Sequence, residues 1–156
     1  MRRQSCAASD FIVPITPFHV AIQVRDIGEA RRFYRDVVGC EEGRSDTEWA
    51  DFNLHGHQLV CHLNPGLGPL GKIASHYNPV DAQNVPVPHC GVVLELDDWT
   101  TLADRLRRHD VRFVIEPSIR FRGAAGEQAT MFLLDPSGNA LEFKSFKDIA
   151  GQLFAI

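Results

Sequence analysis

The sequence predicts an α+β protein made of two modules, each with the element order strand, helix, strand, strand, strand (βαβββ), which together form one concave mixed β-sheet. The first reason is a repeat. The same order of hydrophobic patterns occurs twice, and each copy begins with a strand that opens on a histidine, His19 and then His89. The second reason is size, because a module of about 50–60 residues cannot bury both faces of its sheet without the other copy. The third is the lack of a GxGxxG or GxxxxGK motif, which argues against a doubly wound nucleotide-binding fold.

The elements of the first module follow from alternation and capping. Residues 18–24 alternate between two faces, as a half-buried strand does. A helix follows, because Asp26 and Glu29 have the spacing of a capping box and apolar residues recur at helical spacing until Gly39. Three further strands are predicted at 40–44, 47–54 and 58–63.

The second module repeats this order after a segment rich in proline and glycine that is predicted to be a loop. Its first strand, 89–95, precedes a helix that Asp97 or Asp98 opens. Further strands are predicted at 112–116, around 119–121, at 128–134 and at 140–146. The predicted boundaries, all within one domain, are 16–63 for the first module, 64–87 for the connecting loop, 88–146 for the second module and 147–156 for a C-terminal tail.

The composition argues against several classes of protein. The chain has 156 residues, of which 44% are hydrophobic and 23% charged, with a formal net charge of −4. This composition suits one globular domain and lacks the basic surface that nucleic-acid binding needs. No apolar run approaches the ~18 residues of a membrane helix, and no signal peptide is predicted in the first ten residues. The four cysteines form no C-x-x-C pair, which predicts buried thiols in a protein of the reducing cytoplasm.

Histidines on predicted strands are the first candidates for chemistry. His19, His57, His62 and His89 lie on strands or at their ends, and Glu142 is the acidic residue of the last strand. A carboxylate among apolar neighbours is costly to bury unless a cation accompanies it. Two imidazoles and one carboxylate are the ligand set of non-haem Fe(II) sites, and they also suit zinc, nickel and manganese.

Three phrases carry a family resemblance: FHVA at 18–21, ARRFYRDVVG at 30–39 and FLLDPSGNALE at 132–142. With them the sequence, over residues 16–146, resembles the vicinal oxygen chelate superfamily. That superfamily includes glyoxalase I, methylmalonyl-CoA epimerase, bleomycin- and fosfomycin-resistance proteins, and extradiol dioxygenases. The resemblance implies a cup formed by the two modules, into which the first and last strands of each module point metal ligands.

The resemblance implies that His19, His89 and Glu142 hold one divalent metal ion, as the His-His-Glu set of extradiol dioxygenases does. Fe(II) is the expected ion, with manganese, nickel and zinc as alternatives. The fourth ligand position falls at His62, where glyoxalases carry Glu, epimerases carry Gln and extradiol enzymes have no ligand. His62 would either complete a four-ligand site for isomerase chemistry or lie close to the metal without binding it.

A second phrase favours a dioxygenase. HQLV at 57–60 resembles the start of the same strand in extradiol enzymes, where a histidine near the metal acts as acid/base, which implies that role for His57. The longer phrase WADFNLHGHQLVCHL at 49–63 also resembles a group of bacterial proteins described as predicted extradiol-type dioxygenases. Many extradiol enzymes have a catalytic tyrosine where this chain has Phe132. Phe132, Arg120 and Arg122 are the candidate substrate-binding residues.

The expected function is a metal-dependent extradiol-type dioxygenase that cleaves a small catecholic or other vicinal-oxygen substrate with O2. One alternative is a glyoxalase- or epimerase-like lyase or isomerase with a four-ligand metal. Another is a metal-free binding protein of the bleomycin-resistance kind. The expected partners are the small-molecule substrate, O2 and a second copy of the chain in a homodimer, with no nucleic acid and no membrane.

Overall fold

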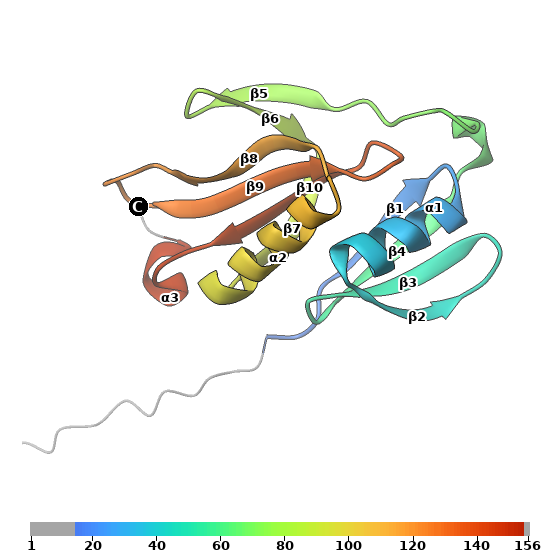
Figure 1. Ribbon diagram of the computed structural model, residues 1–156, viewed down its shortest axis with the longest axis horizontal. Coiled ribbons are helices and arrows are strands. Elements are labelled where there is room, and N and C mark those ends of the chain that lie inside the picture. The colour runs from blue at the N-terminus through green and yellow to red at the C-terminus, as the bar shows by residue number, and fades with distance from the viewer. Residues whose placement is uncertain (1–14, 155–156) are drawn as a thin grey trace, which may run out of the picture.

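The computed structural model describes residues 15–154 and confirms the predicted α+β class with two βαβββ modules (Figure 1). Each module forms its own four-stranded mixed sheet, with the strand orders β1-β4-β3-β2 and β7-β10-β9-β8. The elements of the first module are β1 (His19–Val24), α1 (Ile27–Arg31), η1 (Arg32–Val38), β2 (Glu41–Ser45), β3 (Trp49–Leu54) and β4 (His57–Leu63). The start of the chain, where no signal peptide is predicted, lies outside the described residues.

One helical stretch covers the first sheet and changes geometry along its length. Asp26 caps its start by accepting a hydrogen bond from the backbone N–H of Glu29 at 2.6 Å, as the capping-box spacing predicts. After Arg31 the helix widens into the π-helix η1, at whose end the N–H of Gly39 donates to the carbonyl of Tyr34. Gly39 has a φ of 94°, a left-handed conformation common where helices end. Periodicity predicts the helix but not the π-helical turns, because so short a stretch does not separate the two periods.

The second module contains β7 (His89–Leu94), α2 (Leu96–Arg108), β8 (Phe113–Arg120), β9 (Gln128–Leu134) and β10 (Ala140–Ser145), and α3 (Ile149–Gln152) follows it. Helix α2 begins before the predicted aspartates, with Glu95 at its N-cap and Asp97 and Asp98 in its first turn. There the two carboxylates stabilise the positive end of the helix dipole. The strand pieces predicted at 112–116 and 119–121 are one strand, β8. No helix within residues 15–154 is long and apolar enough to cross a membrane.

The connection between the modules differs from the predicted loop, because it contains a β-hairpin. After a short 3-10 turn, η2 (Pro65–Leu67), the hairpin is formed by β5 (His76–Val80) and β6 (Gln83–Val87). Asp81 and Ala82 make its turn, and both have positive φ, as tight two-residue hairpin turns require. Pro79 and Pro86 conceal these strands in the sequence, since proline within a run argues against a strand.

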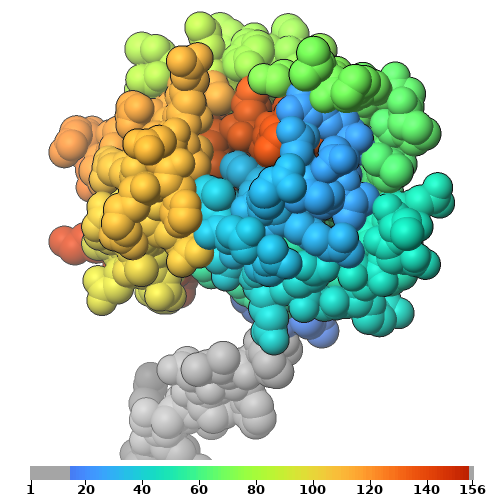
Figure 2. All heavy atoms as spheres, turned by 45° about the vertical axis from the view of Figure 1, so that its right-hand side comes forward, coloured from blue at the N-terminus to red at the C-terminus, as the bar shows by residue number. Residues whose placement is uncertain are grey.

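The hairpin is fastened to the second module. In Figure 2 the connection, in green, runs over the top of the molecule from the first module, in blue, to the second, in orange. Arg120 of β8 donates from Nη2 to the carbonyl of Val80 at 2.6 Å, and its Nε lies 3.7 Å from a carboxylate oxygen of Asp81. Val85 of the hairpin packs with Ile115 and Phe132 in a small apolar cluster. The hairpin therefore covers part of the second sheet.

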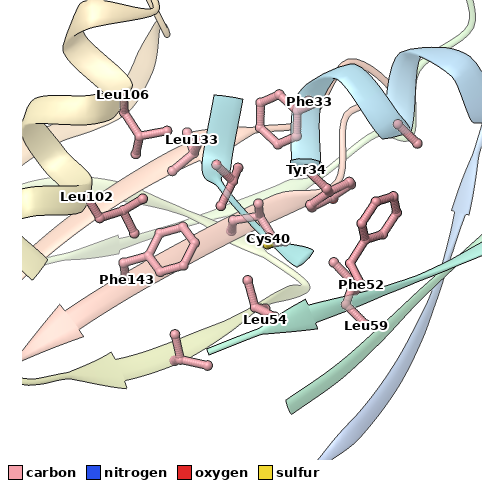
Figure 3. Packing of buried hydrophobic residues seen from close by; sticks show 14 of the residues in the cluster. Phe33, Tyr34, Cys40, Phe52, Leu54, Leu59, Leu102, Leu106, Leu133 and Phe143 are labelled. Atoms are coloured by element: carbon pink, nitrogen blue, oxygen red, sulfur yellow. The ribbon is translucent and has the colours of Figure 1, made fainter. Parts of the chain in front are cut away.

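The helix-covered faces of the two sheets share one hydrophobic core (Figure 3). Leu106 of α2 and Phe143 of β10 lie in the same cluster as Tyr34 of η1 and Leu59 of β4. Cys40 belongs to this core, and burial raises the pKa of its thiol to about 12, so that it stays protonated and unreactive. The opposite face of each sheet is not part of this core, and on the second sheet the hairpin covers part of that face. We call this opposite face the open face.

A buried hydrogen bond ties the two modules together inside this core. The hydroxyl of Tyr34 donates to a carboxylate oxygen of Asp135 at 2.9 Å, and burial raises the pKa of both groups. Asp135 also accepts hydrogen bonds from the backbone N–H groups of Ser137 and Asn139, which shape the turn between β9 and β10. The turn that leads into β10 is thereby attached to the first module.

We expect Tyr34→Phe to lower the free energy of unfolding by about 2 kcal/mol, because a buried carboxylate loses a hydrogen-bond donor. For a chain of this size that corresponds to a melting temperature lower by roughly 5 °C. Tyr77→Phe is the matched control, since Tyr77 is 44% exposed on the hairpin and should change stability little. Equal melting temperatures for the two variants in a calorimetric scan would contradict the importance of this bond.

Candidate metal centre

His89 and Glu142 form an acid-imidazole pair on the open face of the second sheet. In the parallel pairing of β7 with β10, His89 lies opposite Ala140 and Glu142 lies opposite Gly91. Residues directly opposite or two apart share a face, so both side chains project to the same side. His89 Nε2 is 3.2 Å from Glu142 Oε2. The structure thus brings together two of the three predicted metal ligands.

The carboxylate of Glu142 is buried and contacts three polar side chains. The residue is 5% exposed, and it accepts a hydrogen bond from Thr130 Oγ1 at 2.8 Å. Lys144 Nζ lies 3.4 Å from Oε2. Burial acts to raise the pKa of Glu142, but the contacts with His89, Lys144 and Thr130 outweigh it and lower the pKa. Glu142 is therefore held in its ionised form, which is the form that binds a metal.

The imidazole of His89 is oriented by the hairpin. Its Nδ1 lies 2.7 Å from the carbonyl oxygen of Pro86, which can only accept a hydrogen bond. Nδ1 therefore carries a hydrogen, and in the neutral ring Nε2 has the free lone pair. The hydrogen bond with Glu142 raises the pKa of His89. A histidine whose other nitrogen is bound to a carbonyl is the usual arrangement of a metal ligand.

His19 lies on the open face of the first sheet, apart from this pair. Its ring is exposed, and Nδ1 is 2.7 Å from Oε1 of Gln58, the residue opposite it in β4. At the other end of β1, Asn139 Nδ2 of the second module donates to the carbonyl of Gln23, and in the middle of the strand Val20 to Ile22 line a cavity together with His89. His19 is four residues from Gln23, or about 13 Å along the strand. Among residues 15–154 no three His, Cys, Asp or Glu side chains come close enough to hold a metal ion.

The position of the predicted fourth ligand differs from the expectation. His62 pairs with Gln23, at the end of the sheet away from His19, so the two cannot share a metal within this sheet. In the second sheet the predicted carboxylate ligand, Glu142, lies two residues beyond the partner of His89. The equivalent residue of the first sheet is Val60, two residues beyond Gln58 and 6% exposed. The equivalent place therefore holds an apolar side chain.

The predicted acid/base residue also lies elsewhere. His57 precedes Gln58 in β4, so its side chain points to the opposite face from His19 and Gln58. It pairs with Leu54, a residue of the buried core, and its Nδ1 accepts a hydrogen bond from the backbone N–H of Phe18 at 2.9 Å. The geometry does not bring His57 to the metal ligands.

The three candidate substrate residues have different surroundings. Phe132 lies opposite Glu142, and its ring meets the ring of His89 edge-on at 5.1 Å, but it is 1% exposed and packs with Val85 and Ile115, so it supports the imidazole and does not face a cavity. Arg120 is 5% exposed and is used by the hairpin, so it is not free for an anionic substrate. Arg122 is exposed in the loop after β8.

Three polar residues of the site were missed in the sequence. Gln58, Thr130 and Lys144 contact a predicted ligand, but none is a residue type that signals a metal. Lys144 can be predicted from the sequence, because it lies two residues from Glu142 in the same strand and so shares its face. Gln58 and Thr130 required the strand register, which alternation alone does not reveal.

The comparisons with known proteins agree with this architecture. The family model described as Glyoxalase/Bleomycin resistance protein/Dioxygenase superfamily matches residues 16–143. The chain belongs to this superfamily. A glyoxalase/bleomycin resistance protein/dioxygenase from Alicyclobacillus acidocaldarius is 32% identical, with a TM-score of 0.70, over 86% of this chain and 93% of that one. No match was found among curated proteins.

Two more distant members of the superfamily share the fold. The fosfomycin resistance protein FosX from Listeria monocytogenes is 15% identical, with a TM-score of 0.58, over 83% of this chain and 91% of that chain. Lactoylglutathione lyase from Agrobacterium tumefaciens is 16% identical, with a TM-score of 0.55, over 91% of this chain and 98% of its own. The superfamily includes glyoxalases, fosfomycin-resistance proteins and dioxygenases; most members are enzymes, and members generally bind a divalent metal.

Proposed function

We propose that this protein is a metal-dependent dioxygenase of the extradiol type, with the metal held by His19, His89 and Glu142. The observation that carries the proposal is Val60 at the place of a fourth ligand. Two histidines and one carboxylate leave coordination positions open for a chelating substrate and O2, which is the facial arrangement of non-haem Fe(II) oxygenases. A lyase or isomerase with four protein ligands lacks its fourth residue here.

The chemistry of the donors fits such a metal. Both histidines have Nδ1 engaged by an oxygen atom, of Gln58 for His19 and of Pro86 for His89, so each offers Nε2. Glu142 offers Oε2, which in this structure is balanced by His89 and Lys144. When bound, an Fe(II)-type ion supplies Lewis-acid polarisation of neighbouring substrate oxygens and the redox chemistry that O2 requires. Manganese, nickel and zinc are the alternative ions for this donor set, and any of the three would favour lyase or isomerase chemistry.

We further propose that His19 of one chain meets His89 and Glu142 of a second chain in a homodimer. Within one chain His19 is exposed on the first sheet, and no three possible ligands among residues 15–154 come together around it. The strands β1 and β7, which carry the two histidines, are each the edge strand of their sheet. Members of the superfamily commonly form dimers.

The space beside the two half-sites suits a small molecule. A cavity of about 430 Å³ borders Gln58, Asp51 and Asn53 on the first sheet. A second cavity of about 250 Å³ is lined by His89, Glu142 and other residues of β7 and β10. The first of these is by itself in the size range of small-ligand sites. Phe132 packs edge-on against His89 and is itself buried with Val85 and Ile115, so it supports the imidazole from behind.

Metal content and oxygen uptake test the proposed function. We expect protein purified without oxygen or chelators to carry about one iron per chain, and to consume O2 when a panel of catechols is added. His62→Ala should keep both properties, since His62 lies away from the ligands. Nickel or zinc in place of iron, without O2 uptake, would contradict the dioxygenase and favour a lyase or isomerase. A metal-free protein that binds a ligand would favour the binding-protein alternative.

A further inference from the structure

Gln58 lies between His19 and a buried carboxylate. Its Oε1 is 2.7 Å from His19 Nδ1, and its Nε2 donates to Oδ2 of Asp51 at 3.1 Å. Asp51 is 7% exposed, and Gln58 is also partly buried. A cation, Arg44, also lies near Asp51, with its Nη2 3.4 Å from Oδ2. Its side chain is 80% exposed, so this ion pair contributes little to holding the carboxylate. The chain of contacts therefore runs from Asp51 through Gln58 to His19.

The chemistry of these groups sets the direction of each hydrogen bond. An ionised carboxylate only accepts, so the amide NH2 of Gln58 must face Asp51. The amide oxygen of Gln58 then faces His19, and the hydrogen between them must come from the ring. His19 is thereby held with its hydrogen on Nδ1 and its lone pair on Nε2.

We propose that Asp51 and Gln58 form a relay that positions His19, by selecting the tautomer and the ring orientation that leave Nε2 free to bind a metal. This proposal depends on the proposed function in one respect, because it takes His19 to be a metal ligand. It differs from the support of His89, where a backbone carbonyl of the hairpin does the same work. Outer hydrogen-bond partners of this kind typically change metal affinity by about 10- to 100-fold.

The tautomer of His19 in the metal-free protein tests the relay directly. Long-range 15N–1H spectra at about pH 8, where an ordinary imidazole is neutral, report which ring nitrogen carries the hydrogen. We expect Nδ1–H in the unchanged protein and a shift toward Nε2–H in Gln58→Leu, which removes the acceptor at similar size. Asp51→Asn should shift it partly, because the amide of Gln58 is then free to turn over. An unchanged Nδ1–H signal in Gln58→Leu would overturn the relay.

A double variant separates the relay from a general structural role. In Asp51→Asn combined with Gln58→Glu, the new asparagine donates to the new carboxylate, which in turn accepts from His19. This restores the acceptor with the same net charge and the same number of heavy atoms. We expect the Nδ1–H tautomer to return in the double variant, and a failure to return would count against the relay.

Metal affinity, measured by competition with a chelator, then connects the relay to the proposed site. We expect Gln58→Leu to weaken binding of Fe(II) or Mn(II) by about 10- to 100-fold and the double variant to recover most of the loss. If the tautomer shifts as expected while affinity stays constant, the relay holds and His19 is not a ligand, which contradicts the proposed function. If the tautomer does not shift, the relay fails whether or not His19 binds metal.

Discussion

Mixing two inactive variants is expected to restore the metal site. His19→Ala and Glu142→Ala should each lose the bound metal, since each removes one of the three proposed ligands. In a mixed dimer, one of the two sites collects both changes, and the other receives an intact His19 from one chain and an intact Glu142 from its partner. Random pairing of the two chains should therefore recover about one quarter of the metal and of the activity of the unchanged protein.

The control for this experiment joins both changes in one chain. His19→Ala/Glu142→Ala mixed with the unchanged chain gives dimers in which each site contains one change, so mixed dimers should hold no metal. Recovery of metal in these mixed dimers, or none with the two single variants, would contradict a site shared between two chains. Differently tagged chains allow the mixed dimers to be isolated, and metal is measured by plasma emission spectrometry.

Gly91→Ala is expected to have the second large effect, on both stability and metal binding. Gly91 lies opposite Glu142 in the pairing of β7 with β10. A Cβ on Gly91 would overlap the backbone carbonyl of Glu142, and backbone cannot move aside as a flexible side chain can. We expect the free energy of unfolding to fall by about 3 kcal/mol, the upper part of the usual range for overpacking. Metal should be lost as well, because β10 must shift and displace Glu142 from His89.

The control is a glycine in a strand where a methyl group has room. At Gly43 in β2, an added Cβ would meet only ordinary contacts, the nearest at 3.4 Å from Asp51 Cβ. Gly43→Ala should therefore keep its metal and lose little stability. Thermal unfolding and metal content, measured on both variants, test the expectation. A Gly91→Ala protein that is as stable as the control and retains its metal would show that the strands can separate at low cost.

The fold could be predicted largely from local signals in the sequence. The cap at Asp26, the stop at Gly39 and the alternating strands are patterns that neighbouring residues create, and the order of elements recurs in both modules. The hairpin in the connection escaped prediction, because its two prolines resemble loop residues and its pairing is stabilised by contacts with β8. The strand propensity of a short segment does not include its contacts with residues that are distant in the sequence.

The candidate site could be predicted only in part. The pair of His89 and Glu142 lies as the repeat suggests, whereas metal binding by His19 and its partners stays a prediction. His57 and His62 are predicted site residues because both are histidines on strands. The residue type alone does not say to which face of the sheet a side chain points. His57 is one residue from Gln58, the partner of His19, so its side chain points to the core side. His62 is four residues from Gln58 and therefore lies at the other end of the sheet.

The sequence by itself determined the class of fold, the two modules and the residue types available for a metal, because these depend on local periodicity and on the chemistry of single side chains. Only the tertiary structure decided which residues meet. Strand register brings Gln58 to His19 and Val60 to the place of a fourth ligand, and the hairpin brings Pro86 to His89. Register and packing result from the balance of contacts over the whole core, so no short stretch of sequence contains them.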